Sequence, residues 1–151
     1  FSPNAPMTRG MLVTVLYRLA GSPKSAADSG FADVAADKYY ADAVSWAAEN
    51  GIVSGVSDGC FAPDSQVTRE QLAAILYRYA RDKRYDTGKT ADLMGFADYG
   101  QISGYAAEAL GWTNAEGLVS GRSKTALSPQ GSATRAEVAA ILHRFAENVA
   151  K

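Results

Sequence analysis

Apolar residues recur at helical spacing in three long runs of the chain. In each run they fall at positions i, i+3, i+4 and i+7, which places them on one face of an amphipathic helix. The positions are Leu12, Val15, Leu16 and Leu19; Leu72, Ile75, Leu76 and Tyr79; and Val138, Ile141, Leu142 and Phe145. Three equivalent apolar faces most simply bury one another. The pattern therefore predicts an all-α fold, with repeated helix-loop-helix units around a pseudo-threefold three-helix bundle.

Each long run begins with a Thr-Arg pair, at residues 8–9, 68–69 and 134–135. Threonine is a good N-cap, and Gln71 and Glu137 lie three residues after their threonines, as in a capping box. Met11 stands at that place in the first run, so we expect the cap there without the returning bond. Shorter helices are predicted at 39–50 and 105–116, ending at Gly51 and Gly117.

The runs belong to a sequence repeat. Residues 1–20, 61–80 and 127–146 align without a gap, and a block that begins Phe-Ala-Asp precedes the last two, at residues 31–33 and 96–98. We therefore divide the chain into the second half of a first unit (1–21), a second unit (31–81) and a third unit (96–148), together forming one compact module. The links 21–30 and 81–95 are polar and contain glycine, as surface connectors do.

The composition of the chain argues against several classes of function and site. A formal net charge of −1 gives no reason to expect nucleic acid as a partner, and no apolar run reaches the ~20 residues that span a bilayer. With one cysteine (Cys60) and one histidine (His143), an internal disulfide is excluded and a His/Cys metal site is not expected. The chain begins at Phe1 inside a repeat, so we expect a piece of a longer protein, and the missing signal peptide does not argue against secretion.

The ordered motifs resemble those of S-layer homology (SLH) domains, which attach bacterial surface proteins to the cell wall. They are Phe-Ala-Asp at 31–33 and 96–98, NGIVSGVSDGCFAPDSQVTRE at 50–70, and EGLVSGRSKTALSPQGSATRAE at 116–137. The resemblance implies three units in a pseudo-threefold helical bundle, located outside the cell at the wall. It also implies binding of secondary cell wall polysaccharide, often carrying pyruvate ketals, in grooves between units. The first unit lacks its Phe-Ala-Asp block and short helix, so upstream sequence or a second copy of the chain would have to complete its groove.

The arginines after the threonines are the leading candidates for glycan binding. A cation at the positive end of a helix is unfavourable by ~0.3–1 kcal/mol, yet Arg9, Arg69 and Arg135 repeat it three times. A bound anion would explain this, because a helix N-terminus presents free N–H groups and a guanidinium adds a bidentate carboxylate receiver. The alternative is an internal ion pair, for instance with Asp33 or Asp98, that only fixes the units together.

The other candidate residues each have a second interpretation. Asp33 and Asp98 either accept bonds from sugar hydroxyls or cap a local turn. Tyr39 and Tyr105 fall where SLH domains usually have tryptophan, and either stack on a sugar or pack in the core. Two glycines before the variable loop either let the backbone approach a ligand or serve a turn that needs positive φ; they are Gly55 and Gly121. Trp46 and Trp112 are expected in the core.

No constellation in the sequence favours an enzyme or a cofactor. Asp33 and Asp98 are equivalent residues of different units, so we do not expect them to face each other as a catalytic pair, and no Ser or Cys pairs plausibly with His143. We expect a non-enzymatic module without metal or membrane insertion. A rival class is a structural module whose grooves only join units or chains.

Overall fold

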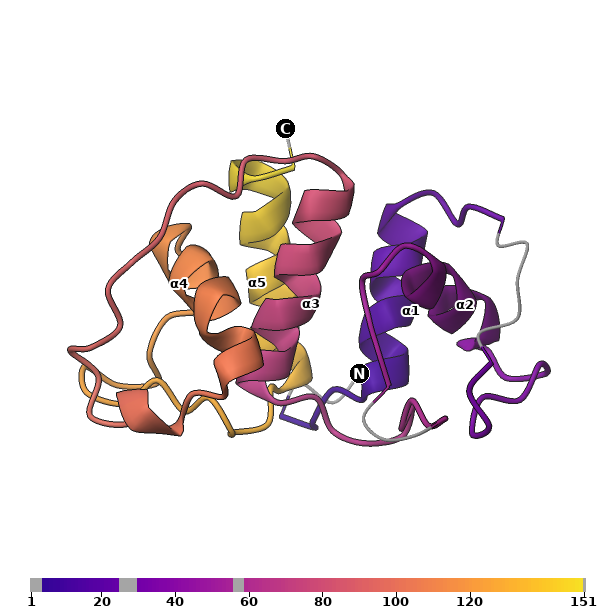
Figure 1. The fold of residues 1–151 in the computed structure, drawn as a ribbon, viewed down its shortest axis with the longest axis horizontal. Coiled ribbons are helices and arrows are strands. Elements are labelled where there is room, and N and C mark those ends of the chain that lie inside the picture. The colour runs from indigo at the N-terminus through magenta and orange to yellow at the C-terminus, as the bar shows by residue number, and fades with distance from the viewer. Residues whose placement is uncertain (1–3, 25–29, 56–58, 151) are drawn as a thin grey trace. The chain divides into compact units, whose positions relative to one another are not determined.

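The computed structural model of the chain describes residues 4–24, 30–55 and 59–150, and its regular elements are helices (Figure 1). The described residues form isolated bridging pairs but no strand, so the predicted all-α class is confirmed. Part of the predicted connector 21–30, and loop residues 56–58, lie outside the described residues.

The chain divides into two compact units whose boundaries fall inside the sequence repeats. Unit 2 is Met7–Val67, and unit 1 comprises Phe1–Pro6 with Thr68–Lys151. Each unit therefore combines the long helix of one repeat with the short helix and loop of the next.

Unit 2 is built on α1 (Arg9–Leu19) and α2 (Ala41–Glu49). Its core includes Leu12, Leu16 and Val44, which are completely buried, and Trp46, which is 4% exposed. The rings of Tyr17 and Trp46 lie 5.6 Å apart and join the two helices.

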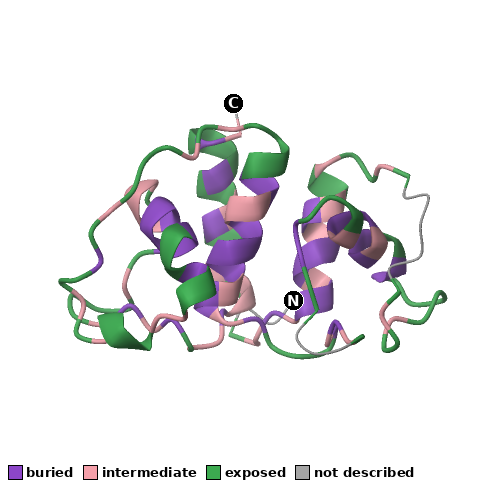
Figure 2. Ribbon diagram, in the orientation of Figure 1, coloured by how far each residue is buried: buried purple, intermediate pink, exposed green. Residues whose placement is uncertain are grey.

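Unit 1 contains α3 (Arg69–Asp82), the 3₁₀ turns η1 (Tyr99–Gln101) and η2 (Gly104–Ala106), α4 (Ala107–Ala115) and α5 (Arg135–Asn148). Tyr77 and Trp112 repeat the ring pair of unit 2 at the same 5.6 Å, and Tyr79 packs on Phe145 of α5 at 5.8 Å. Buried residues follow the inward faces of these helices (Figure 2). Both tryptophans lie in cores, as predicted.

The helix ends follow the sequence signals. Thr68 and Thr134 form complete capping boxes, and Thr8 accepts from the Met11 N–H without a returning bond, as predicted. Gly51 and Gly117 follow α2 and α4 with φ of 70° and 74°, the left-handed conformation that glycine adopts without strain.

Candidate functional site

The buried Arg9 organises a cluster in unit 2. Its Nε donates to the Phe61 carbonyl at 3.0 Å, its Nη2 donates to the Ser54 carbonyl at 3.2 Å, and its guanidinium lies 4.6 Å from the centre of the Phe61 ring. The whole residue is only 5% exposed. Arg9 thus ties the first helix of unit 2 to the loop that follows α2.

Arg69 occupies the equivalent position in unit 1. Its Nε donates to the Leu127 carbonyl at 3.0 Å, its Nη2 donates to the Ser120 carbonyl, and its Nη1 forms an ion pair with Glu137 at 2.6 Å. Ser120 and Leu127 are the repeat equivalents of Ser54 and Phe61, so the two arginines make the same pair of backbone contacts. We call these groups the Arg9 cluster and the Arg69 cluster.

The N–H groups at the start of α1 and α3 are already bonded. The Arg9 and Gly10 N–H groups donate to Ser65 and Pro63 carbonyls at 2.9 and 2.8 Å. At α3, the Arg69 and Glu70 N–H groups donate to carbonyls of the turn before α5, at 2.8 and 2.9 Å. The expectation of free N–H groups is therefore wrong for these two helices. The arginine at the positive helix end is stabilised by carbonyl oxygens and, for Arg69, by a carboxylate.

Asp33 and Asp98 hold the turn that precedes a long helix. The two oxygens of Asp33 accept the Phe61 and Ala62 N–H groups, both at 2.8 Å. Asp98 accepts the Leu127 and Ser128 N–H groups at 2.9 and 2.8 Å. These bonds lower the pKa of both carboxyl groups, and the nearby arginine of each cluster adds to the effect. Each of these turns lies 28 to 30 residues after its aspartate, so the aspartates do not cap a local turn. Arg69 forms its ion pair with Glu137 and not with Asp98.

The two candidate tyrosines are exposed. Tyr39 is 62% exposed with its ring 5.0 Å from that of Tyr40, and Tyr105 is 54% exposed. The Tyr105 hydroxyl donates to the Glu70 carboxylate at 3.2 Å. Neither tyrosine is part of a core, so both rings are accessible to a ligand.

Comparison with known proteins identifies the family of this chain. The model of the S-layer homology domain matches residues 30–73 and 95–139, more than half of the chain. The chain belongs to the SLH domain family. The matched segments contain Asp33, Tyr39 and Arg69 in one repeat and Asp98, Tyr105 and Arg135 in the next.

The SLH chain is also similar to long bacterial proteins over nearly its whole length. It is 34% identical to the surface-layer 125 kDa protein of Lysinibacillus sphaericus over 99% of this chain and 12% of that protein. It is 26% identical to the cellulosome-anchoring protein of Acetivibrio thermocellus, over 97% of this chain and 33% of that protein. The amylopullulanase of Thermoanaerobacterium thermosulfurigenes is 32% identical, over 97% of this chain but only 8% of the enzyme.

These relatives place the SLH module at the bacterial cell surface and support cell-wall anchoring as its general role. The chain spans a small part of each relative, from 8% to 33% of its length in these three. The similarity to the amylopullulanase therefore carries no information about catalysis by this chain.

A buried acid that sequence reasoning missed distinguishes the two clusters. Glu70 is 2% exposed, and its carboxylate accepts the Ser103 N–H at 3.0 Å as well as the Tyr105 hydroxyl. Gly10 stands at the equivalent position in unit 2, where a Cβ would lie 3.0 Å from the Tyr40 ring. Tyr40 aligns with the small Ala106 in the next repeat, and this exchange of sizes was the signal available in the sequence.

Glu137 joins two arginines in unit 1. Besides Arg69, it binds Arg122 Nη2 at 2.8 Å, and Arg122 comes from the more cationic loop of the third repeat. Burial opposes ionisation of Glu137, but the Thr134 N–H and the two guanidinium groups hold its pKa below the ordinary value. Burial lowers the pKa of the Arg69 guanidinium, against the opposing effect of Glu137.

Three candidate residues remain: two glycines and the arginine at the start of α5. Gly121 does not have a left-handed φ; a Cβ there would lie 2.5 Å from the Ser123 carbonyl and 2.9 Å from that of Ala126. Gly55 is exposed, next to the undescribed residues 56–58. Arg135 is half-buried at the start of α5, with its N–H bonded to the Ala5 carbonyl at 2.9 Å.

The described residues hold no group of three or more His, Cys, Asp or Glu side chains arranged to bind a metal ion. Across the same ranges, no helix combines the length and apolar character needed to cross a membrane.

Proposed function

We propose that this SLH module attaches a bacterial surface protein non-covalently to the cell wall by binding an acidic secondary wall polysaccharide, with pyruvate ketals as the candidate acidic groups. The observation that supports the proposal is that both units combine the same three kinds of residue from two successive repeats. Each set has a buried arginine, an aspartate on the adjoining turn and an exposed tyrosine.

In this proposal, the tyrosines make the principal contact with sugar. An aromatic face binds the C–H surface of a sugar ring, and Tyr39 and Tyr105 present most of their surface to solvent. Asp33 and Asp98 hold the turns that begin at Phe61 and Leu127 and retain lone pairs for a sugar hydroxyl, because a carboxylate can accept about four bonds. Gly55 and Gly121 border the same loops.

The arginines attract a ligand by their positive charge and do not offer an unoccupied guanidinium for a bidentate carboxylate contact. Arg69 is 4% exposed and already bound to Glu137, so a ligand carboxylate approaches the pair through Arg122, whose side chain is 40% exposed. The ligand acid then competes with Glu137 for the two guanidinium groups. We propose the corresponding electrostatic role for Arg9, and for Arg135 where a second copy or upstream sequence completes the first repeat.

Each contact in such a site is modest. Two or more sites on one polymer would raise retention through effective concentration, without any single tight interaction. In this proposal the module acts without catalysis.

The test is the affinity of the chain for purified, solubilised wall polymer, measured by isothermal titration calorimetry. The double variant Tyr39→Ala, Tyr105→Ala should lose most of the binding, because both exposed faces are removed. The double variant Tyr39→Phe, Tyr105→Phe is the matched control, because it keeps both rings and should bind nearly as the wild type does. Equal binding by the alanine variant and the wild type would refute the proposed sites.

A second candidate function is structural: the clusters only hold repeats or chains together in a surface assembly. The burial of Arg9 and Arg69 in internal bonds favours it. It predicts no binding of wall polymer and a molecular mass that rises with protein concentration, as measured by sedimentation equilibrium. Polymer binding by a monomer would exclude it.

We also propose that the three long helices form the pseudo-threefold bundle. Bridging pairs support it, because equivalent positions pair in each case: Thr8 with Gln66, Thr68 with Ser132, and Thr134 with Pro6. A radius of gyration well above ~15 Å, the value for a compact chain of this length, would contradict a single bundle.

A further inference from the structure

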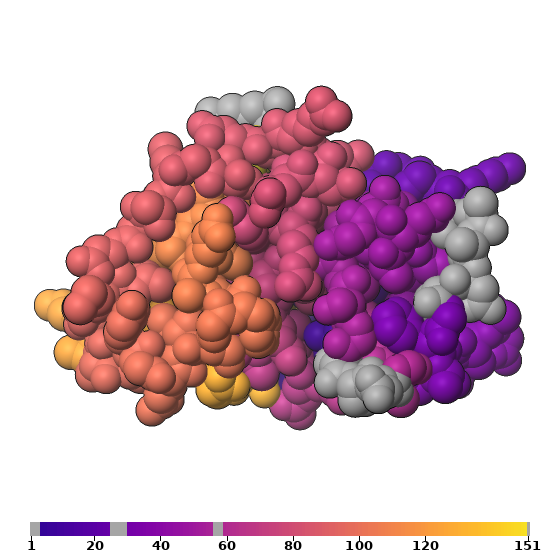
Figure 3. All heavy atoms as spheres, in the orientation of Figure 1, coloured from indigo at the N-terminus to yellow at the C-terminus, as the bar shows by residue number. Residues whose placement is uncertain are grey.

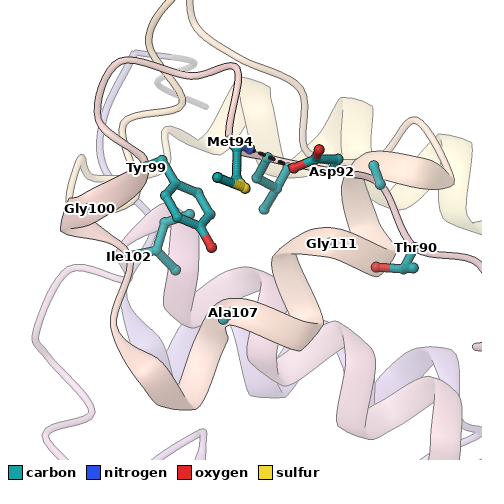
Figure 4. Close-up of a pocket in the computed structure, with 10 residues that line it drawn as sticks. Thr90, Asp92, Met94, Tyr99, Gly100, Ile102, Ala107 and Gly111 are labelled. Carbon is teal, nitrogen blue, oxygen red and sulfur yellow. Dashed lines mark hydrogen bonds between the residues drawn. The ribbon is translucent and has the colours of Figure 1, made fainter.

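Unit 1 contains a pocket of about 410 Å³ between the connector that follows α3 and the start of the third repeat. The connector residues 90–94 form one wall, and η1, Ile102 and two residues of α4, Ala107 and Gly111, form the others (Figure 4). These segments contribute much of the visible surface of unit 1 (Figure 3). The volume lies within the ~300–1,000 Å³ typical of ligand pockets.

The wall of this pocket is fixed in place by specific contacts. The Ala91 N–H donates to the Gly111 carbonyl at 3.0 Å, and a Cβ on Gly111 would lie 2.7 Å from the Thr90 hydroxyl. Further along, the Trp112 indole donates to the Asp86 carbonyl at 3.3 Å, and Lys89 pairs with Glu116 at 3.3 Å. The connector is therefore held against α4, so little ordering is required when a ligand enters.

The chemistry of the lining fits an uncharged sugar. Tyr99 is 46% exposed and projects from η1 into the pocket, with the apolar Met94 and Ile102 beside it (Figure 4). Polar groups come from the Tyr99 and Thr90 hydroxyls and from Asp92, one oxygen of which accepts the Met94 N–H at 2.9 Å. The described lining includes one carboxylate and no Lys, Arg or His, so it disfavours an anionic group. An aromatic face with a few hydroxyl-binding groups suits a neutral pyranose.

The pocket adjoins the Arg69 cluster through one short segment. Within residues 98–105, Asp98 binds the Leu127 N–H of the Arg69 cluster, and Ser103 and Tyr105 bind Glu70, the residue after Arg69. The same segment contributes Tyr99, Gly100 and Ile102 to the pocket. A polymer that crosses this segment can reach both places at once.

We propose that this pocket is a second subsite, which takes an uncharged sugar residue of the polymer whose acidic residue binds at the Arg69 cluster. The inference rests on the proposed function. It adds a neutral specificity element to a site that is otherwise selective for acidic groups.

The test follows the Met94 methyl signal in NMR spectra of chain labelled with ¹³C at methionine methyl groups. The chain has three methionines, so the signal is assigned from a Met94→Leu variant. Solubilised wall polymer should shift the Met94 signal, and Tyr99→Ala should abolish that shift and weaken binding by about three- to tenfold, as expected for one aromatic contact. Tyr99→Phe, which keeps the ring, should retain most of the affinity.

A second titration uses the same polymer after its carboxyl groups have been reduced to alcohols. Affinity should fall because the Arg69 cluster loses its partner, yet the Met94 shift should persist at higher polymer concentration. Polymer binding with an unmoved Met94 signal and unchanged affinity of Tyr99→Ala would overturn the subsite alone. Loss of the shift on carboxyl reduction would also overturn it, whereas no binding of either polymer by the wild type would refute the proposed function and the subsite with it.

Discussion

Replacement of Arg69 by alanine tests whether the repeated arginine is part of the architecture of the module. Arg69 is 4% exposed, and each of its three side-chain nitrogens donates to a partner in the third repeat: the Leu127 carbonyl, the Ser120 carbonyl and Glu137. Arg69→Ala removes these bonds together with the packing of the arginine stem. We therefore expect unit 1 to lose stability whether or not any glycan is present.

The expected fall in the free energy of unfolding follows from the hydrogen bond that each partner of Arg69 loses. The carbonyl of the buried Leu127 is left without its donor, which costs about 1–3 kcal/mol. Breaking a buried ion pair costs about 3–5 kcal/mol when the remaining charge is uncompensated. Glu137 retains Arg122 at 2.8 Å and its side chain is 27% exposed, so its part is much smaller than that. Ser120 is exposed and water can replace its donor. The free energy of unfolding should fall by about 2–4 kcal/mol.

The assay is urea denaturation followed by tryptophan fluorescence. Trp46 lies in unit 2 and Trp112 in unit 1, so a Trp46→Phe background leaves a reporter of unit 1 alone. Arg69→Lys keeps a charge but places one nitrogen where arginine places three, and it should recover only part of the loss.

Arg144→Ala is the matched control, because Arg144 is exposed on α5 and its removal should change the free energy of unfolding by less than about 0.5 kcal/mol. If Arg69→Ala were as stable as this control, the buried contacts of Arg69 would not stabilise the fold and the reasoning would be wrong.

Three further predictions follow from the same contacts. Tyr105→Ala should weaken binding of wall polymer by about three- to tenfold, and it should lower the melting temperature no more than Tyr105→Phe does, since both remove the hydroxyl bond to Glu70 and the ring itself is 54% exposed; a much larger loss of stability in the alanine variant would assign the ring to the core. The folded-state pKa of Asp98 lies below 3.8, so its carboxylate contributes stability that is full above that pH and is lost as the pH falls through the folded value. Asp98→Asn should therefore lower the urea midpoint at neutral pH and differ less from the wild type in acid, and a constant difference would contradict this assignment. Gly121→Ala should destabilise unit 1 by about 1–3 kcal/mol in the urea assay because its Cβ would meet carbonyl oxygens, whereas Gly100→Ala, with no atom within 4 Å, should not; similar midpoints would remove the packing role of Gly121.

The sequence predicted the features that depend on neighbouring residues. A capping box depends only on residues a few positions apart, and the boxes at Thr68 and Thr134 form as predicted. The glycines after α2 and α4 are likewise left-handed, as predicted. The apolar spacing of the long runs likewise predicted most of their buried positions, because one helix turn determines which side chains point together. The prediction was wrong for Leu19, which is 50% exposed at the end of α1, and Val15 and Leu142 are only partly buried.

Contacts between repeats could not be predicted from the local sequence. The Asp98 carboxylate binds N–H groups about 30 residues further along the chain, and a carbonyl of the same distant turn takes the Arg69 N–H. No local pattern specifies such partners. A helix taken alone has free N–H groups in its first turn, so its own sequence predicts free donors that the following repeat in fact satisfies.

The role of Glu70 could not be predicted from the sequence, for a different reason. Its position is occupied by Gly10 and Ala136 in the other repeats, so it did not look like part of a motif. Its role depends on Ser103 and Tyr105, which reach it from the next repeat. Unit 2 pairs the small Gly10 with the large Tyr40, and unit 1 pairs the large Glu70 with the small Ala106. This exchange of sizes links the two positions, but it is recognised only when they are known to lie together in the fold.

The most direct test of the central claim is co-sedimentation of the chain with purified Gram-positive cell walls, before and after acid extraction of the polymers other than peptidoglycan. The account predicts that the chain sediments with intact walls, that extraction abolishes this binding, and that the Tyr39→Ala, Tyr105→Ala double variant stays in the supernatant with both preparations. Undiminished binding to extracted walls would contradict it, because peptidoglycan itself would then be the ligand.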